Sequence, residues 1–305
     1  MIRRVLLAAA RGERARELVT ATSVARRVAA RFVAGERPAD ALDVVRVLAA
    51  DGITATVDWL APPAASVAAA REATVAYLGL LDLAQDAGLA AGLDVSVRLA
   101  ALGRSVPYGG EKICYEDALE ICARAAALGA TVTLDAQEHT SVGPALDLLA
   151  DLRRDFPLTG TALQAHLRRT PEDCRDLAGT ACRVRLHAGA DGAPRQGALT
   201  RRRDLDASFT RCLETLLAGG GYPMVATHDP GLLAVAARLA TEHRRAPDSF
   251  EYQLAHGVRP HEQLRLVSRG ARVRVRLPYG ADWYPYLLRR LADRPAKHAS
   301  FARLG

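Results

Sequence analysis

The sequence predicts an α/β fold, a (βα)8 barrel of the TIM type, with N-terminal helices before the barrel and a final helix over the active site. Two observations support this prediction. Short apolar runs rich in β-branched residues alternate along the chain with longer segments of helical periodicity, an order typical of a parallel sheet. There are eight such units, the number that closes a parallel sheet into a barrel.

Residues 1–51 are predicted to form helices that pack on the barrel. Apolar residues recur there at intervals of three and four, as at Val24, Val28 and Phe32, which is the spacing of an amphipathic helix. We expect residues 52–305 to form the barrel domain.

Strands are predicted where short apolar stretches are bounded by polar residues, Gly or Pro. They are Ile53–Asp58, Asp94–Leu102, Ala130–Ala136, Thr161–Leu167, Cys182–His187, Met224–Thr227, Phe250–Leu254 and Arg272–Leu277. Helices predicted between them include Tyr115–Leu128, Val142–Arg154, Pro171–Ala178, Asp206–Ala218 and Pro230–His243. An open doubly wound sheet is the alternative, but no Gly-x-Gly-x-x-Gly turn follows the first strand and no Walker phosphate loop occurs.

Composition and charge exclude several classes of protein. The 305 residues are 50% hydrophobic and 25% charged, with 41 basic and 34 acidic side chains, as in a folded soluble protein. The excess positive charge is scattered, and its densest run, residues 201–203, is followed by Asp204 and Asp206. A nucleic-acid binder concentrates such charge on one face, so we expect no nucleic-acid partner.

Cysteine usage and hydropathy indicate the compartment. Five cysteines without a C-x-x-C spacing match neither a disulfide framework nor a zinc site, and we predict no metal. No cleavage pattern follows the N-terminal apolar run, and no apolar stretch is long enough to cross a membrane. These features favour a cytoplasmic protein without an integral membrane segment.

Polar residues recur at the carboxyl ends of the predicted strands, which is where a barrel of this kind holds its chemistry. In chain order they are Asp58, Arg98, Asp135, Gln164 with His166, Arg185 with His187, Thr227 with His228, Gln253 with His256, and Arg276 with Tyr279. Each also has a structural interpretation. Asp135 could cap a helix or form an ion pair, Gln164 and Arg185 could bond loop backbone, and His228 could simply begin a helix.

The last helical segment carries an aromatic ring and two arginines, Tyr286, Arg289 and Arg290. Their spacings of three and four place the ring and at least one guanidinium on one helix face. A guanidinium presents a planar fork that matches a carboxylate. The alternative is a solvated arginine pair on a surface helix.

Several segments, taken in order, resemble the proline dehydrogenase family, flavin-dependent barrel enzymes that oxidise proline to its cyclic imine. They are Val95–Leu99, Leu134–Ala136, Asp155–Pro157 leading to Gln164–Arg169, Arg185–Leu186 with Gly189–Ala190, Ala226–His228, Phe250–Gln253 and Tyr284–Leu291. The resemblance extends over roughly residues 55–295. Each segment is weak alone, but the shared order is specific.

The resemblance implies an FAD across the top of the barrel. Gln164 and Arg185 would lie near the isoalloxazine, and Thr227 with His228 would hold the rest of the cofactor. The segment after Arg185 adds His187, Gly189 and Ala190 to the implied cofactor-binding residues.

The resemblance also implies a substrate site. Asp135 would lie in it, Arg289 and Arg290 would pair with the substrate carboxylate, and Tyr286 would stack over the substrate ring. We expect Asp135, Arg98 and Tyr286 to be the residues closest to the catalysis.

The sequence departs from the family pattern on one side of this site. Arg98 stands where the family has a lysine, Ala188 where it has a flavin-supporting lysine, Asp191 and Arg276 where it has pocket tyrosines, Ala255 where it has a leucine, and Asp293 where it has a glutamate. We therefore expect Arg276, Asp191 and Ala255 to shape the substrate pocket. Either Asp191 and Arg276 neutralise each other across an enlarged site, or they meet charges on a larger, more polar substrate, because buried charges need partners.

The favoured hypothesis is an FAD-dependent dehydrogenase or oxidase that acts on an amino or imino acid other than proline. Its partners would be that small carboxylate-bearing molecule and an electron acceptor: a quinone, another carrier or oxygen. Ordinary L-proline dehydrogenase, yielding pyrroline-5-carboxylate, is the first alternative. A degenerate barrel that has lost flavin and acts as a binding protein is the second, and Ala188 supports it because the lost lysine removes positive charge beside a reduced flavin.

Overall fold

The computed structural model describes residues 22–135, 142–188 and 197–292. Eight parallel strands close into a barrel in chain order. They are β1 (Thr54–Trp59), β2 (Asp94–Arg98), β3 (Thr131–Asp135), β4 (Gly160–Gln164), β5 (Arg183–His187), β6 (Tyr222–Ala226), β7 (Glu251–Ala255) and β8 (Val273–Tyr279). The last strand closes the ring on the first, with Thr56 of β1 in register with Arg276 of β8. The predicted (βα)8 barrel is confirmed.

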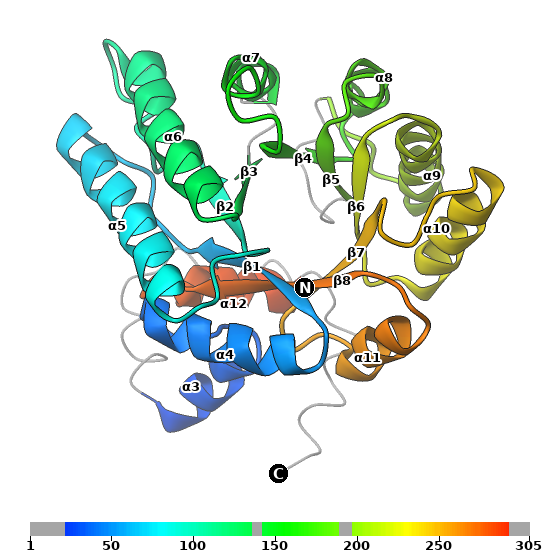
Figure 1. The fold of residues 1–305 in the computed structure, drawn as a ribbon, viewed down its shortest axis with the longest axis horizontal. Coiled ribbons are helices and arrows are strands. Elements are labelled where there is room, and N and C mark those ends of the chain that lie inside the picture. The colour runs from blue at the N-terminus through cyan, green and yellow to red at the C-terminus, as the bar shows by residue number, and fades with distance from the viewer. Residues whose placement is uncertain (1–21, 136–141, 189–196, 293–305) are drawn as a thin grey trace.

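Helices surround the barrel (Figure 1). They are α3 (Ser23–Ala30), α4 (Pro38–Ala50), α5 (Val67–Asp86), α6 (Gly110–Ala127), α7 (Val142–Leu152), α8 (Thr170–Ala178), α9 (Arg202–Ala218), α10 (Pro230–Glu242), α11 (Pro260–Ser268) and α12 (Trp283–Ala292). Side-chain capping fixes where some of them begin. Ser66 Oγ accepts from the amide of Ala69 at the start of α5, and Asp229 Oδ1 accepts from Gly231 and Leu232 at the start of α10.

The main apolar core lies between the strands and the helices. Successive side chains of a strand point to opposite faces, so Val184 and Leu186 of β5 face outward and both are buried in this core. The inward positions, in contrast, are largely polar. On β2 these are Asp94, Ser96 and Arg98, all buried, whereas a typical TIM barrel fills this space with branched apolar side chains.

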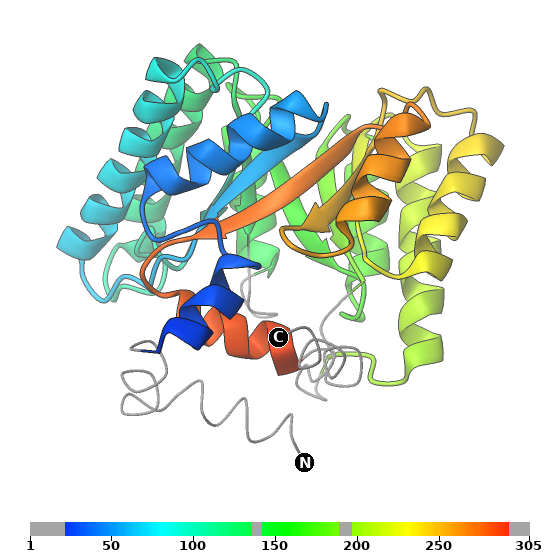
Figure 2. The ribbon, with the colours of Figure 1, turned by 90° about the horizontal axis from the view of Figure 1, so that it is seen from below.

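Helices α3 and α12 lie together at the carboxyl-end face of the strands (Figure 2). A second apolar cluster, which includes Phe32 after α3, Leu60 after β1 and Trp283 of α12, joins them. Gly257, after β7, has φ +70° and lies so close to α3 that an added Cβ would stand 1.7 Å from the carbonyl oxygen of Arg31. Only glycine fits there, and the expected final helix over the carboxyl-end face is present.

Two predicted strands are too long. The structure ends β2 at Arg98 and β4 at Gln164. After Arg98 the apolar run continues, but Leu99 and Leu102 are buried in a turn, in which the Leu102 amide donates to the Leu99 carbonyl. An apolar run in a buried loop cannot be distinguished from strand by composition.

Two helix boundaries also differ. Helix α9 begins at Arg202, four residues before the predicted start, and an Arg202–Asp206 ion pair links its first turn to its second. In the N-terminal segment, α3 ends at Ala30, and Val28, predicted on an apolar face, is 41% exposed. Residues 1–21 lie outside the described part of the chain. Across the residues that are described, none of the helices could span a membrane.

Candidate functional site

Two arginines and two carboxylates form a cluster at the carboxyl ends of β1, β2, β3 and β8. Arg276 Nη2 lies 2.6 Å from Asp58 Oδ2 and 3.1 Å from Asp135 Oδ2. Asp58 also accepts from Arg98, at 3.3 Å from Nε and 3.4 Å from Nη2. The order of contacts is therefore Arg98, Asp58, Arg276, Asp135, and we call these four side chains the upper ion cluster.

Asp58 is the centre of the upper ion cluster and has no exposed surface. Burial on its own would raise the pKa of Asp58, but the positive charges of Arg276 and Arg98 more than reverse this, so its pKa lies below the ordinary value. The same attraction raises the pKa of Arg276 against the effect of burial. Asp58 is therefore a fixed anion that holds two cations at the mouth of the barrel.

A second set of ionic contacts lies deeper in the barrel. Arg185 has no exposed surface, and its Nη2 lies 2.8 Å from Asp94 Oδ2 while its Nε donates to Gln253 Oε1 at 2.7 Å. Asp94 also accepts from Thr56 and Thr133. Burial outweighs the attraction of Asp94 and lowers the pKa of Arg185. Arg185 is therefore bonded to side chains inside the barrel. The structural interpretation, in which it bonds loop backbone, does not describe these contacts.

Helix α12 covers the upper ion cluster. Tyr286 packs against the second apolar cluster, and burial raises its pKa although the cations of Arg290 and Arg276 act in the opposite direction. Arg290 Nη2 lies 3.5 Å from His228 Nε2, and the same nitrogen of His228 accepts from the amide of Ala255 at 2.8 Å. Ala255 is the last residue of β7, so this contact ties α12 to the carboxyl ends of β6 and β7.

The carboxyl ends of β4 and β5 present two histidines. His187 ends β5 in register with Gln164, which ends β4, and His166 follows β4 and is 4% exposed. Nδ1 of His166 is buried without a hydrogen-bond partner. Burial, then the positive charges of Arg276 and Arg185, lower the pKa of His187 well below its ordinary value. Two imidazoles thus stand at this end of the barrel, and burial lowers the pKa of His166 as well.

Thr227 continues this edge after β6. It is 3% exposed, and its Oγ1 accepts from the amide of Asp229. The side chains available to hold a cofactor at this edge are therefore Gln164, His166, His187, Thr227 and His228.

Four predicted site residues cannot be placed in this arrangement. Gly189, Ala190 and Asp191 lie outside the described residues, as does the side chain of Arg289, whose backbone is in α12. The pairing of Asp191 with Arg276 stays a prediction, and the described partners of Arg276 are Asp58 and Asp135.

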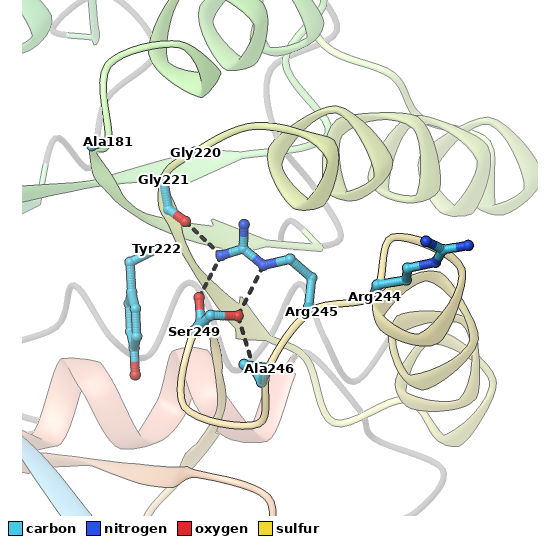
Figure 3. Close-up of a pocket in the computed structure, with 8 residues that line it drawn as sticks. All are labelled: Ala181, Gly220, Gly221, Tyr222, Arg244, Arg245, Ala246 and Ser249. Atoms are coloured by element: carbon cyan, nitrogen blue, oxygen red, sulfur yellow. Dashed lines mark hydrogen bonds between the residues drawn. The ribbon is translucent and has the colours of Figure 1, made fainter.

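The opposite end of the barrel has a pocket of about 420 Å³ (Figure 3). Its lining includes Gly221 and Tyr222 at the start of β6 and Arg245 after α10. Arg245 donates to the carbonyls of Gly219, Gly221 and Ser249. These contacts fix the loops that precede β6 and β7, and a site at the amino-terminal face of a barrel is read as structural rather than catalytic.

The sequence alone does not indicate that Asp58 is the centre of the upper ion cluster, or that a nitrogen of His166 is buried without a partner. Both stand at predicted strand ends, but neither was assigned a role. The signal for Asp58 is the alternation Thr54, Thr56, Asp58 on β1, which places three polar side chains on the inward face. Its partners come from β2 and β8, and only the closed ring brings those together.

Comparison with known proteins places these features in context. Residues 41–302 match the family model described as proline dehydrogenase. The chain is 33% identical over 274 residues to proline dehydrogenase 2 of Bacillus subtilis, covering 90% of this chain and 89% of the relative. It is 34% identical over 280 residues to the proline dehydrogenase of Deinococcus radiodurans, covering 91% and 89%.

Solved structures share the fold. A crystal structure of proline utilization A (PutA) from Bdellovibrio bacteriovorus, inactivated by N-propargylglycine, matches with a TM-score of 0.81 at 24% identity, over 91% of this chain and 34% of that one. A variant of PutA from Bradyrhizobium japonicum matches with a TM-score of 0.71 at 25% identity, over 92% and 32%. This chain therefore spans about a third of the PutA chains that it matches.

Proposed function

The chain belongs to the proline dehydrogenase family, and on that premise we propose that it is an FAD-dependent oxidoreductase acting on the carbon–nitrogen bond of an amino or imino acid. We propose further that this substrate is larger or more polar than proline. Its electrons would pass to a quinone, another carrier or oxygen.

One observation carries the substrate part of the proposal: the guanidinium of Arg276 stands inside the mouth of the barrel beside Asp58 and Asp135. A tyrosine at this position, as in the family pattern, would give the pocket an aromatic wall. An arginine instead gives it a charge and additional hydrogen-bond donors. A pocket of this kind favours a polar substrate over a small apolar ring, because guanidinium donors that Asp58 and Asp135 do not use are unfavourable when they lose water without gaining an acceptor.

The residues at the carboxyl ends of β4, β5 and β6 fit a flavin. The Nδ1 atom of His166 is buried without a partner, and His187, half-buried at the end of β5, makes no side-chain hydrogen bond among the described residues. A flavin ring carries acceptors and a donor along its edge, which suit such groups. Together with Gln164, Thr227 and His228, these residues would hold the cofactor.

Arg185 fits this picture differently from the sequence prediction. Its guanidinium has no exposed surface and is bonded to Asp94, Gln253 and Ser96. As described, Arg185 fixes the strands beneath the cofactor region. Its direct contact with the isoalloxazine stays a prediction.

The bound flavin would supply the hydride acceptor, and the protein would position the substrate carbon against it. Arg290, with Arg289 on the same helix, would pair with the substrate carboxylate. Tyr286, partly buried on the same helix, would cover the substrate and exclude water. Arg98 would add positive charge from the opposite side while Asp58 holds it in place.

Asp135 would orient the substrate amine or Arg276. Since Arg276 already donates to Asp135 at 3.1 Å, this carboxylate is part of an ion pair, and its role is to position groups. These assignments of Asp135, Arg98 and Tyr286 rest on where the side chains stand and on the family resemblance.

Ordinary L-proline dehydrogenase is the second candidate. The observation that favours it is the identity of 33–34% to two proteins named proline dehydrogenase over about nine-tenths of their length. Under this candidate Arg276 would be a neutralised wall of the pocket, held by Asp58 and Asp135, and would take no part in choosing the substrate.

An absorbance spectrum of the purified protein, repeated without oxygen after each addition of L-proline and then of larger amino and imino acids, tests both candidates. A flavin band bleached only by a larger compound supports the proposal, and one bleached by proline supports the second candidate. No band after soaking with excess FAD overturns both and leaves a barrel that acts as a binding protein.

A further inference from the structure

Arg276 uses one of its three guanidinium nitrogens for its described contacts. The close approaches to Asp58 and to Asp135 both come from Nη2. The Nε atom is buried without a hydrogen-bond partner. For Nη1, no hydrogen bond to any described residue is formed. An arginine has five N–H donors, so three of them, one on Nε and two on Nη1, have no acceptor among the residues that the structure describes.

The buried Nε is the unusual one of these donors, because a buried polar group that gives up water without a new partner is unfavourable and rare in folded proteins. The other barrel arginines differ in how fully they are bonded, and Nε of Arg183 on β5 is also buried without a partner. Arg274, also on β8, donates to Glu251 and to two backbone carbonyls, and Arg185 donates through all three of its nitrogens. Because Arg276 stands among the site residues at the carboxyl-end face, its vacant donors point to an acceptor outside the described residues, and a bound ligand is one that this face can admit.

The net charge of the site also indicates an acidic group on the ligand. The upper ion cluster balances two arginines against two carboxylates, and Arg290 of α12 adds a further cation beside it. An ordinary amino acid brings one carboxylate and one ammonium group, so its own net charge is zero. Binding it would leave the charge of Arg290 uncompensated, whereas a substrate with two carboxylates and one ammonium would bring one net negative charge to offset it.

The positions of the cations separate two acid-binding points. Arg290 comes from α12, on the side of His228 and the ends of β6 and β7. Arg276 comes from β8, on the side of Asp58 and Asp135. Tyr286 lies close enough to both arginines for each to act on its pKa. A ligand close to Tyr286 can therefore meet both cations.

We infer that Arg276 is a specificity-determining residue that binds a second acidic group of the substrate, which makes the substrate a dicarboxylic amino or imino acid. This inference rests on the proposed function and names the substrate class of the same site. The carboxylate next to the reacting carbon pairs with Arg290, and the distal carboxylate accepts from Nη1 of Arg276, since Nε is enclosed by protein atoms.

Binding of two compounds that cannot be oxidised at a carbon–nitrogen bond tests this inference without turnover. The probes are glutarate, a dicarboxylate, and valerate, its monocarboxylate counterpart of equal chain length, each titrated into the purified protein by calorimetry. We expect the wild-type protein to bind glutarate at least about tenfold more tightly than valerate, the effect of one charge-assisted pair.

Three variants locate the effect. Arg276→Gln is expected to remove the preference for glutarate and to leave valerate binding within about twofold of wild type. Arg276→Lys keeps the charge but loses the planar fork, and is expected to reduce the preference without abolishing it. Arg269→Gln, at the exposed end of α11, is the control and is expected to change neither dissociation constant.

The outcomes separate this inference from the function on which it rests. Equal affinities for the two probes, no measurable glutarate binding, or an undiminished glutarate preference in Arg276→Gln would each overturn it. If Arg276→Gln does not fold, as judged by circular dichroism, an undiminished glutarate preference in Arg276→Lys overturns the inference instead. A flavin band that bleaches with proline, together with equal probe affinities, would overturn the dicarboxylate inference and keep the redox function. The lack of any flavin band would overturn the redox function itself.

Discussion

Arg185 and Asp94 form an ion pair across the inside of the barrel, with Nη2 and Oδ2 2.8 Å apart and no exposed surface on either side chain. The two residues belong to β5 and β2, which are not neighbours in the sheet. Contacts of this kind cross the barrel from one wall to another. They tie together strands that share no backbone hydrogen bonds.

Asp94→Asn is expected to destabilise the protein strongly. The substitution leaves the buried guanidinium of Arg185 without its anion, and breaking one side of a buried pair lowers the free energy of unfolding by about 3–5 kcal/mol. Denaturant unfolding followed by circular dichroism measures this loss. Asp43→Asn is the control because its pair with Arg46 is exposed, and it is expected to cost about 0–1 kcal/mol. Equal losses in the two variants would show that the interior pair does not stabilise the barrel.

Protonation of His187 is expected to destabilise the fold in mild acid. Its pKa in the folded state lies well below the ordinary value, so between the two pKa values the unfolded chain binds more protons than the folded protein. The contribution of His187 to the free energy of unfolding is therefore complete above about pH 6.5. It decreases as the pH falls from there towards the pKa of His187 in the folded protein.

Urea unfolding at about pH 7.5 and about pH 5 measures this dependence. His166 and His256, whose pKa values burial also lowers, contribute in the same direction. His187→Asn is expected to make the dependence shallower, whereas His261→Asn on α11 is expected to leave it as in wild type. A His187→Asn protein with the wild-type pH dependence would contradict the assignment.

Gly257→Ala is expected to loosen the attachment of α3. The alanine would have to adopt φ +70° and would push against the carbonyl oxygen of Arg31. Gly270→Ala is the matched control, since φ there is +78° and nothing lies within 4 Å of the added Cβ. The backbone penalty, about 1–2 kcal/mol, is common to both.

Thermal unfolding and limited proteolysis distinguish the two alanine variants. Gly257→Ala is expected to melt at a lower temperature than Gly270→Ala and to be cleaved sooner near α3. Identical melting and cleavage would mean that the close approach of Arg31 does not hold this helix.

Loss of either arginine on α12 is expected to weaken substrate binding. In Arg289→Ala or Arg290→Ala, the apparent KM for the substrate identified by bleaching is expected to rise about tenfold to a hundredfold, the effect of losing a charge-assisted hydrogen bond. Steady-state kinetics with an artificial electron acceptor gives the value. Arg265→Ala, on the exposed face of α11, controls for loss of charge alone. An unchanged KM in both α12 variants would remove the proposed carboxylate clamp.

The order of strands and helices could be predicted from the sequence because their periodicity differs. Val142–Leu152 and Thr170–Ala178 have apolar residues at helical intervals, and the structure has helices there. The end of β2 was harder to predict, since Leu99 and Leu102 are buried in a loop. An apolar run indicates that its residues are buried, and does not by itself indicate that they form a strand.

The site could be predicted only in part. Strand ends gave Arg98, Asp135 and Arg276 as candidates, but which carboxylate meets which guanidinium depends on the ring of strands closing. Asp58 contacts residues 40 and more than 200 positions away along the chain, and no local pattern encodes such a pair. For Arg185 the family resemblance implies a place near the isoalloxazine, which stays a prediction, and the sequence does not indicate that its described partners lie inside the barrel.

The polar barrel interior also bears on how the protein responds to temperature. Unfolding exposes apolar surface, which raises the heat capacity, and polar surface, which lowers it. A barrel filled with Thr, Asp, Arg and Gln side chains exposes more of the second kind than one filled with Val and Leu. The curve of stability against temperature is therefore expected to be flatter than that of an apolar barrel of equal length, with less loss of stability in the cold.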